Sequence, residues 1–169
     1  MIDFNRDVMP LRNKFYRLAL GLLRNTAEAE DITQETLIRL WTRCNSLSSP
    51  QEAEALGLTI SYNLARDTLG RAGRNYEPLD NLDESQALDT SANAIDSLYA
   101  ADRREMLRRM INTLPVKQQT IVQLRDIEGK SYKEIAGIMQ LSEEQVKITL
   151  FRARQSLKQL YAKIKHNGN

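Results

Sequence analysis

Hydrophobic residues in the first 25 positions recur with the spacing of one helix face. The repeat consists of Phe4, Val8, Leu11, Phe15, Leu18 and Leu22. Steps of four and three residues alternate in an amphipathic α-helix, so the pattern predicts one helix that ends near Asn25. Thr26 is the expected cap of a second helix, with Glu28 in the first turn, where the helix dipole favours an anion.

The second predicted helix runs to about Cys44 and has one apolar and one mixed face. Its inward residues are expected to be Ala29, Ile32, Thr36, Leu37, Leu40 and Cys44. Ile38 lies among the polar residues of the other face, which are Asp31, Gln34, Glu35, Arg39 and Thr42. A hydrophobe among charges is typical of a protein-docking surface, and a simple solvated face is the alternative that the pattern leaves open.

A third helix has the most clearly marked start in the chain. Ser49 is a cap residue, Pro50 suits the first helical position, and Glu52 places an acid in the first turn. The helix should continue through Ile60 and end near Gly70. The arginines close to this end are Arg66, Arg71 and Arg74. They could contact nucleic acid, whereas Asn63 and Asp67, spaced i to i+4, are more suited to capping or bracing neighbouring helices.

Residues 76–98 differ in composition from the chain on either side. The segment has six acidic residues, no basic residue and no clear hydrophobic period, which predicts a linker. A helix with Met106, Leu107, Met110 and Ile111 is expected from about Tyr99. Another should begin at Leu114-Pro115 and end at Gly129. Its inward residues are expected to be Ile121, Val122, Leu124 and Ile127.

Residues 131–154 contain two capping signatures eleven residues apart. Ser131 precedes Glu134 by three positions, and Ser142 precedes Gln145 by three. The stretch from Ile138 to Leu141 is too short for an independent loop. The segment therefore predicts a helix-turn-helix whose first helix ends near Met139.

The last predicted helix has a continuous apolar stripe. This stripe is formed by Val146, Leu150, Ala153, Leu157, Leu160 and Ile164. The opposite face should present Glu144, Ile148, Phe151, Arg152 and Gln155, with Lys147 and Arg154 on one flank. Exposed apolar residues beside cations suit a DNA major groove, and burial of the same residues by another helix is the competing interpretation. Six lysines and arginines follow Glu144 without a further acid, which favours contact with phosphate.

Charge divides the chain into three parts. Residues 1–75 have a net charge of +1, residues 76–98 of −6 and residues 99–169 of +7, within the overall +2 of the 169-residue chain. We therefore expect an all-α fold of two small helical domains, 1–75 and 99–169, joined by an acidic linker.

Other sequence features bear on the compartment and on catalysis. Cys44 is the only cysteine, and neither a signal-peptide pattern nor a run of eighteen apolar residues occurs. These observations predict a cytoplasmic protein without disulfide, metal cluster or membrane insertion. The single histidine, His166, lies in the tail, and no nucleophile–base spacing or phosphate-binding glycine loop is present. We expect neither enzymatic activity nor a cofactor.

Three segments resemble an extracytoplasmic-function (ECF) sigma factor, the smallest type of the main bacterial sigma family. AEDITQET at 29–36 with Leu40-Trp41 is similar to the family's AEDLVQE…LW. Leu114-Pro115 followed by LRDIEGKSYKEIA at 124–136 resembles LP…LRDIEGLSYEEIA. Val146-Lys147 with RAR at 152–154 matches VK…RAR. The resemblance extends over about residues 4–164.

The resemblance implies binding to core RNA polymerase and to promoter DNA. By position, the polymerase-binding residues would be Asp31, Gln34, Glu35, Ile38 and Arg39. A loop that accepts a flipped −10 base would consist of Asn45, Ser46, Leu47, Ser48 and Ser49. The melted −10 strand would run along Asn63, Arg66, Asp67, Arg71 and Arg74. The −35 element would contact Lys133, Glu144, Gln145, Lys147, Ile148, Thr149, Phe151, Arg152 and Arg154. The acidic linker would enter the RNA path of the polymerase.

The same resemblance implies a free monomer and an inhibitory anti-sigma factor as a further partner. Two departures from the family pattern bear on the site. Ile148 and Thr149 replace a common serine and arginine, so the −35 sequence should differ. Gln140 replaces a glycine at a turn position that often needs a positive φ. A dimeric helix-turn-helix regulator is the alternative function, although it would leave the mixed face of residues 31–39 and the acidic linker without a role.

Overall fold

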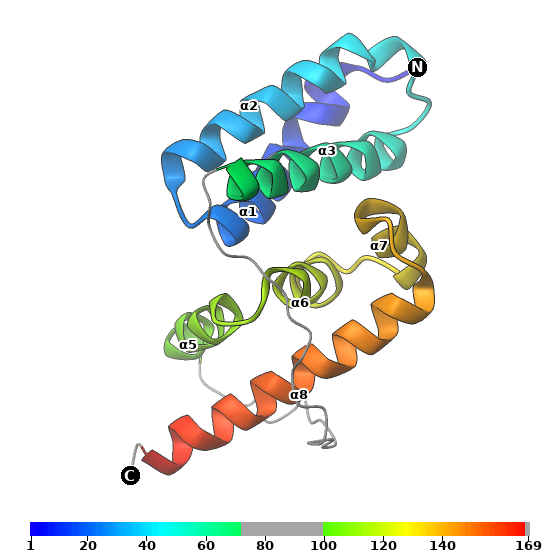
Figure 1. Ribbon diagram of the computed structural model, residues 1–169. Coiled ribbons are helices and arrows are strands. Elements are labelled where there is room, and N and C mark those ends of the chain that lie inside the picture. Colours follow the sequence, from blue (N-terminus) through cyan, green and yellow to red (C-terminus); the bar gives the residue numbers. More distant parts are fainter. Residues whose placement is uncertain (72–99, 168–169) are drawn as a thin grey trace.

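The computed structural model describes residues 1–71 and 100–167, and their regular structure is entirely helical (Figure 1). The first range contains η1 (Phe4–Val8), η2 (Met9–Leu11), α1 (Arg12–Leu23), α2 (Thr26–Thr42), η3 (Cys44–Ser46) and α3 (Pro50–Arg71). The second contains α5 (Ala100–Asn112), α6 (Val116–Val122), η4 (Gln123–Ile127), α7 (Tyr132–Met139) and α8 (Glu143–Asn167). The expected all-α fold class is confirmed. The expected linker, 76–98, lies outside the described residues.

The first helical group is built from α1, α2 and α3, each of which contacts the other two. Phe15, Leu18, Leu40 and Leu58 are almost fully buried between them. Gly57 allows α3 to approach α1 closely, because a Cβ atom at this position would lie 2.2 Å from Cζ of Phe15. Close helix contact at Gly57 therefore sets the spacing of this core.

The prediction of a single N-terminal helix from the hydrophobic repeat is wrong. Residues 4–8 form a π-helical turn, residues 9–11 a 3₁₀ turn, and only then does α1 begin. Pro10 lacks a backbone N–H and so cannot continue a regular α-helical ladder. The apolar period survives the break, since Val8 and Phe15 are both buried. The expected cap is also one residue off, because Asn25 caps α2 and its Oδ1 accepts from the Glu28 N–H at 2.9 Å.

The expected start of α3 is confirmed. Ser49 Oγ accepts from the Glu52 N–H at 3.1 Å. The Glu52 carboxylate accepts in return from Ser48, from the hydroxyl at 2.7 Å and from the backbone N–H at 2.8 Å. These hydrogen bonds lower the pKa of Glu52, and the bond from the Ser48 hydroxyl has the largest effect.

The second helical group packs α8 against α5, α6 and α7. Ile121, Leu124, Ile135 and Val146 form the centre of its core. Three sequence expectations fail around this core, at Ile127, Ile164 and Gln155. The hydrophobic period predicts the other core residues correctly. These three residues differ because of where the helices end and which neighbours they pack against.

Ile127 is 52% exposed, because it ends the π-helical turn η4 and the chain then changes direction at Gly129, which has φ +73°, before α7 begins. Ile164 is 39% exposed, since the last turns of α8 run beyond the other helices (Figure 1). Gln155 is buried at 4% exposure instead of facing outward. Contacts from both α5 and α6 bury a wider arc of α8 than a single stripe predicts.

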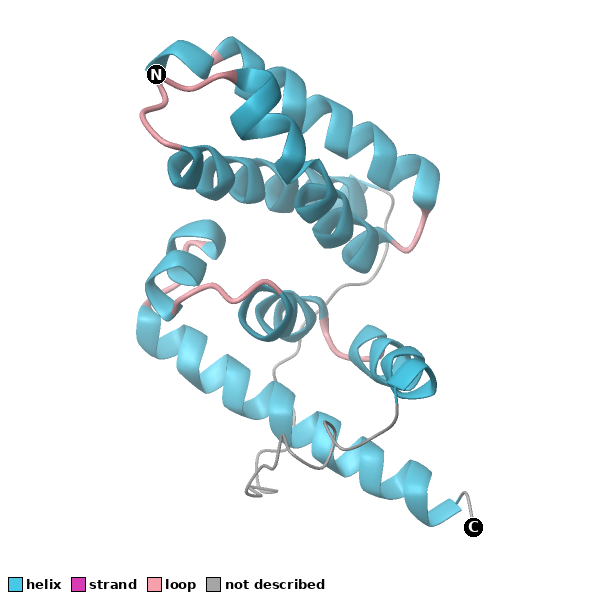
Figure 2. Cartoon of the chain, turned by 180° about the vertical axis from the view of Figure 1, so that it is seen from behind, coloured by secondary structure: helices cyan, strands magenta, loops and turns pink. Residues whose placement is uncertain are grey.

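The two helical groups contact one another in the structure. Contacts join α3 to α7 and α1 to α6, and the views from the front and from behind both show these groups stacked (Figure 2). Hydrogen bonds across this contact join residues 76 to 111 positions apart in the sequence.

Gly57→Ala should destabilise the first helical group by about 1–3 kcal/mol, because overpacking forces Phe15 or the helix backbone to move. Gly70→Ala is the matched control on the same helix, since a Cβ there meets no atom within 4 Å. It should be neutral or stabilising by about 0.5–1 kcal/mol. Urea unfolding of both variants checks the difference, and equal stability would contradict the close contact.

Candidate nucleic-acid interface

Two reciprocal caps fix the helix-turn-helix. Ser131 Oγ accepts from the Glu134 N–H at 3.0 Å, and Glu134 accepts from the Ser131 N–H at 2.8 Å. Ser142 Oγ accepts from the Gln145 N–H at 3.0 Å, and Gln145 accepts from the Ser142 N–H at 2.9 Å. Both capping predictions are confirmed, and they set where α7 and α8 begin.

The turn between α7 and α8 contains a left-handed residue. Gln140 has φ 58° and ψ 48°, and its N–H donates to the Ala136 carbonyl. Leu141 N–H donates to the same carbonyl at 3.0 Å. The expected positive φ at Gln140 is confirmed, at a cost of about 1 kcal/mol relative to glycine. The turn lets α8 leave α7 without an intervening loop.

The outer face of α8 presents two hydrophobes to solvent. Ile148 is 50% exposed and Phe151 is 51% exposed, so no helix of the described chain covers them. Glu144, Gln145 and Lys147 are exposed on the same helix, and Lys133 is exposed on α7. Thr149, Arg152 and Arg154 are half-buried. This combination of apolar and cationic residues suits thymine methyl groups and phosphates.

Several cations of this face are held by neighbouring groups. The Tyr132 ring contacts Arg125, whose guanidinium carbon is 4.5 Å from the ring centroid, and Lys147, whose Nζ is 5.7 Å away. Arg154 Nη2 donates to Asp126 Oδ1 at 2.5 Å. Arg125, Lys147 and Arg154 beside α8 therefore each contact a side chain of the chain itself.

The outer face of α2 carries the predicted docking residues. Asp31, Gln34 and Arg39 are exposed, and Ile38 is 56% exposed. Glu35 is half-buried and accepts from Arg39 Nε at 2.9 Å.

Sequence reasoning missed Trp41 as part of this face. Trp41 is 62% exposed and meets Phe4 edge to face, with ring centroids 5.1 Å apart. Its position three residues after Ile38, on the same side of the helix, was the available signal.

The predicted −10 residues lie around η3 and on α3. Asn45, Ser46 and Ser48 are exposed and Ser49 is half-buried, whereas Leu47 is 7% exposed and belongs to the core.

On α3, Arg66 Nη2 is 3.5 Å from Asn63 Oδ1 and its guanidinium carbon is 5.2 Å from the Tyr62 ring centroid. Asp67 and Arg71 are exposed. Arg74 lies outside the described residues.

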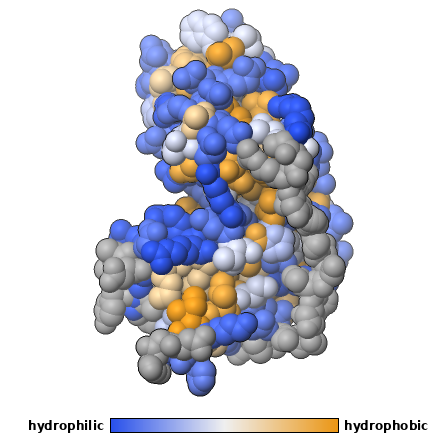
Figure 3. All heavy atoms as spheres, turned by 60° about the vertical axis from the view of Figure 1, so that its left-hand side comes forward, coloured by the Kyte–Doolittle hydropathy of each residue, from blue (hydrophilic) through white to orange (hydrophobic). Residues whose placement is uncertain are grey.

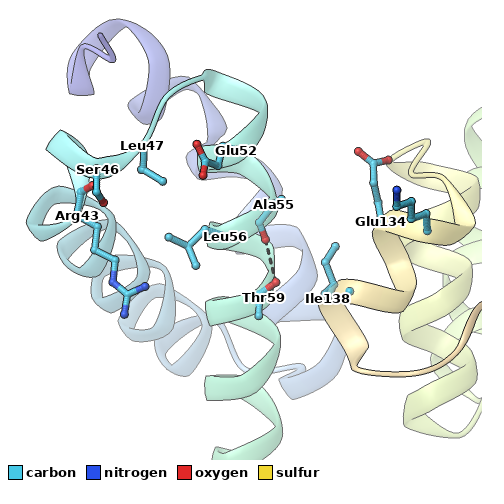
Figure 4. A pocket seen from close by; sticks show the side chains of 11 residues that line it. Arg43, Ser46, Leu47, Glu52, Ala55, Leu56, Thr59, Glu134 and Ile138 are labelled. Carbon is cyan, nitrogen blue, oxygen red and sulfur yellow. Dashed lines mark hydrogen bonds between the residues drawn. The ribbon is translucent and has the colours of Figure 1, made fainter.

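A pocket of about 630 Å³ lies between α3 and α7. Figure 4 shows Leu47 and Leu56 on one side of it, and Glu134 and Ile138 on the other. Ser46 and Lys133 also line this pocket. Two residues predicted to contact the −10 element, Ser46 and Leu47, and one predicted to contact the −35 element, Lys133, therefore face the same cavity.

Charged groups also connect the two helical groups. Glu54 of α3 accepts from Lys14 Nζ at 3.2 Å and from Lys130 Nζ. Glu128 accepts from Arg17 Nε at 2.9 Å and from Arg17 Nη2 at 3.0 Å, and its side chain is only 2% exposed. Burial alone would raise the pKa of Glu54, but the bonds from Lys130 and Lys14 outweigh it and lower the pKa.

Backbone carbonyls contribute further contacts between the groups. Gln119 Nε2 donates to the Gly21 carbonyl, and Arg24 donates to the Asn112 carbonyl. A second pocket of about 510 Å³ lies between α1 and α5, where its lining includes Arg17, Arg24, Arg104 and Arg108. Figure 3 shows the hollow between the two halves with hydrophilic residues on both sides. The contact between the groups thus combines ion pairs and hydrogen bonds with apolar side chains such as Leu20, Leu56 and Ile138.

Within the described ranges, 1–71 and 100–167, no cluster of three or more histidine, cysteine, aspartate or glutamate residues could hold a metal ion. No helix there combines the length and the apolar character needed to cross a bilayer.

The geometry defines a protein of two helical domains with a helix-turn-helix in the second. The chain matches the family models of Sigma-70 region 2 over residues 8–75 and of Sigma-70 region 4 over residues 104–157. It therefore belongs to the sigma-70 family of RNA polymerase sigma factors, in the ECF group. Sigma factors in general are not enzymes.

Curated relatives support this membership. The chain is 35% identical to the ECF RNA polymerase sigma factor SigE of Mycolicibacterium smegmatis, over 89% of this chain and 58% of the relative. It is 28% identical to the probable RNA polymerase sigma factor RfaY of Xanthomonas campestris, over 92% and 39%. It is 28% identical to the ECF RNA polymerase sigma factor SigM of Bacillus subtilis, over 88% and 89%. The chain thus spans less than two thirds of the first two relatives.

Two solved structures share the fold. Sigma factor RpoE of Bartonella quintana, in complex with the anti-sigma factor NepR, has a TM-score of 0.70 at 23% identity, covering 95% of this chain and 97% of that one. CnrH in complex with the cytosolic domain of CnrY has a TM-score of 0.65 at 21% identity, covering 95% and 88%.

Glu54→Gln should weaken the contact between the two helical groups, because the neutral amide cannot balance Lys14 and Lys130. Hydrogen exchange at α7 should rise, and the radius of gyration should increase. Glu105→Gln is the control, since Glu105 pairs with Arg108 and Arg109 of its own helix. Unchanged exchange in the Glu54 variant would contradict the assignment.

The same contact should depend on pH with a definite sign. Because the folded pKa of Glu54 is lowered, its contribution is complete above the ordinary value of 4.5 and is lost as the pH falls through the folded pKa. Scattering measured between pH 7 and pH 3 should therefore show opening at the acid end. In the Glu54→Gln variant the radius of gyration should change less between pH 7 and pH 3, because position 54 no longer titrates.

Proposed function

We propose that this chain directs core RNA polymerase to specific promoters and initiates transcription from them. The observation that carries the proposal is the presence, in order on one chain, of matches to Sigma-70 region 2 and Sigma-70 region 4. The exposed residues on α2 and α8 support it, because each surface offers a hydrophobe set among charges. The proposed domains are 1–75 and 99–169, with 76–98 as the linker that enters the RNA path.

Each surface has a proposed partner. The α2 face around Ile38 binds core polymerase, the residues around η3 and on α3 bind the melted −10 strand, and α8 with Lys133 binds the −35 duplex. Ile148 and Thr149 set a −35 preference that differs from that of relatives with serine and arginine there. The proposed action is binding without chemistry of its own and without a cofactor.

Promoter binding requires the two helical groups to separate. The −10 and −35 elements are separate stretches of the duplex, and each base pair between them adds about 3.4 Å. Ser46 and Lys133 line one pocket, so they cannot contact both elements while the groups are stacked. The polar ion pairs between the groups suit a contact that must open.

We also propose that an anti-sigma factor binds the stacked form of this chain. In the absence of a partner, the chain is proposed to be a cytoplasmic monomer. Support comes from the two solved sigma factors above, each of which was solved with an anti-sigma protein or a domain that binds it. A dimeric helix-turn-helix regulator is not favoured, because it gives no role to the region 2 match over residues 8–75.

Transcription in vitro with core polymerase over a promoter library tests the proposal. We expect discrete start sites that depend on the added chain, preceded by shared −10 and −35 sequences. Absence of specific starts, from a folded protein that forms a complex with core polymerase, would refute it.

Ile38→Ala and Ile148→Ala form a matched pair on the two exposed surfaces. Ile38→Ala should weaken core polymerase binding by about 1–2 kcal/mol, roughly 5–30-fold, and leave −35 duplex binding unchanged. Ile148→Ala should leave polymerase binding unchanged and alter the −35 preference. Fluorescence titrations with core polymerase and with promoter duplex measure both. Equal effects of the two variants on both partners would contradict the division of roles.

A further inference from the structure

Asp126 and Arg154 form a two-point ion pair beside the outer face of α8. Arg154 Nη2 lies 2.5 Å from Asp126 Oδ1, and Arg154 Nε lies 3.4 Å from Asp126 Oδ2. The side chains are 34% and 38% exposed, so solvent reaches both. The Nε–Nη2 edge of a guanidinium is also the edge that binds phosphate oxygens in pairs. Asp126 and a DNA phosphate would therefore compete for the same donors.

The carboxylate comes from a different part of the chain than the cations around it. Helix α8 has no acid after Glu144, and Asp126 lies 28 residues before Arg154, in η4. The nearby Arg125 and Lys147 both contact the Tyr132 ring and are not neutralised by it. Asp126 thus lowers the charge of this surface at one defined position.

We infer that Asp126 limits the binding of DNA of arbitrary sequence by holding the Arg154 guanidinium that would otherwise bind a phosphate. The inference rests on the proposed function only in that α8 binds DNA. Affinity for arbitrary sequences comes from phosphate contacts, each of which contributes about 0.9 to the slope of log affinity against log salt. While Asp126 occupies Arg154, that contact is not made.

On a promoter the balance between the two anions changes. Base contacts made by the rest of α8 fix the register of the duplex and keep one phosphate beside Arg154. That phosphate can then replace the carboxylate, whereas a duplex that slides under the helix does not stay in place to do so. Asp126 therefore acts as a specificity-determining residue, raising the ratio of promoter binding to non-promoter binding.

The test uses the full chain and a labelled random-sequence duplex, titrated between 50 and 200 mM KCl by fluorescence anisotropy. Asp126→Asn should steepen the salt slope by about 0.9, which makes the affinity change over this range larger by about 3.5-fold. Asp126→Asn combined with Arg154→Gln should return the slope to the wild-type value, because the released cation is gone.

Glu105→Gln is the charge-matched control, since it removes one acid that pairs with arginines on α5. An equal change of slope in this control would overturn the inference, as would an unchanged slope in Asp126→Asn or no binding to the duplex at 50 mM KCl. Thermal melts separate a loss of folding from a change of charge, because partial unfolding lowers affinity without adding a phosphate contact. Transcription is not the readout, so failure of the sigma-factor proposal would be seen separately.

Discussion

Buried carboxylates at the contact between the two helical groups control how this chain is arranged. Glu128 has a side chain only 2% exposed and pairs with Arg17. A buried charge without such a partner is strongly destabilising. Glu54 is in a similar position between Lys14 and Lys130. When the two helical groups separate, both charges of such a pair return to water. The hydration free energy that they regain offsets the electrostatic attraction that is lost. An interface of this kind holds a defined geometry with a small net free energy, which suits the proposal that the two halves separate to bind different pieces of DNA.

Local signals in the sequence predicted most of the helix boundaries. The caps at Ser49, Ser131 and Ser142 depend on residues three positions away, and each was found where expected. The left-handed Gln140 was also expected, because the family pattern has a glycine at this turn position. Hydrophobic period was less reliable where a helix changes type or passes its neighbours. Pro10 divided the first helix, and Ile127 and Ile164 came to the surface for these reasons.

Contacts between distant segments could not be predicted from the sequence. Arg17 and Glu128 are 111 positions apart, and nothing in either neighbourhood indicates the other. The outward positions of Ile38 and Ile148 followed from the helix period, so the centres of two candidate surfaces were found. The pairing of Arg154 with Asp126 was not, because a cation on a helix flank looks the same in sequence whether or not a carboxylate reaches it. Burial of Leu47 likewise follows from tertiary packing.

The exposed tryptophan on α2 has a practical consequence. Trp41 is the only tryptophan of the 169 residues, and it lies next to Ile38 on the surface proposed to bind polymerase. Indole emission from the native chain therefore originates from this one surface. A partner that covers α2 should shift that emission to shorter wavelength, while a duplex held only by α8 should leave it unchanged. The molecule thus carries an intrinsic optical reporter that distinguishes occupancy of its first domain from occupancy of its second.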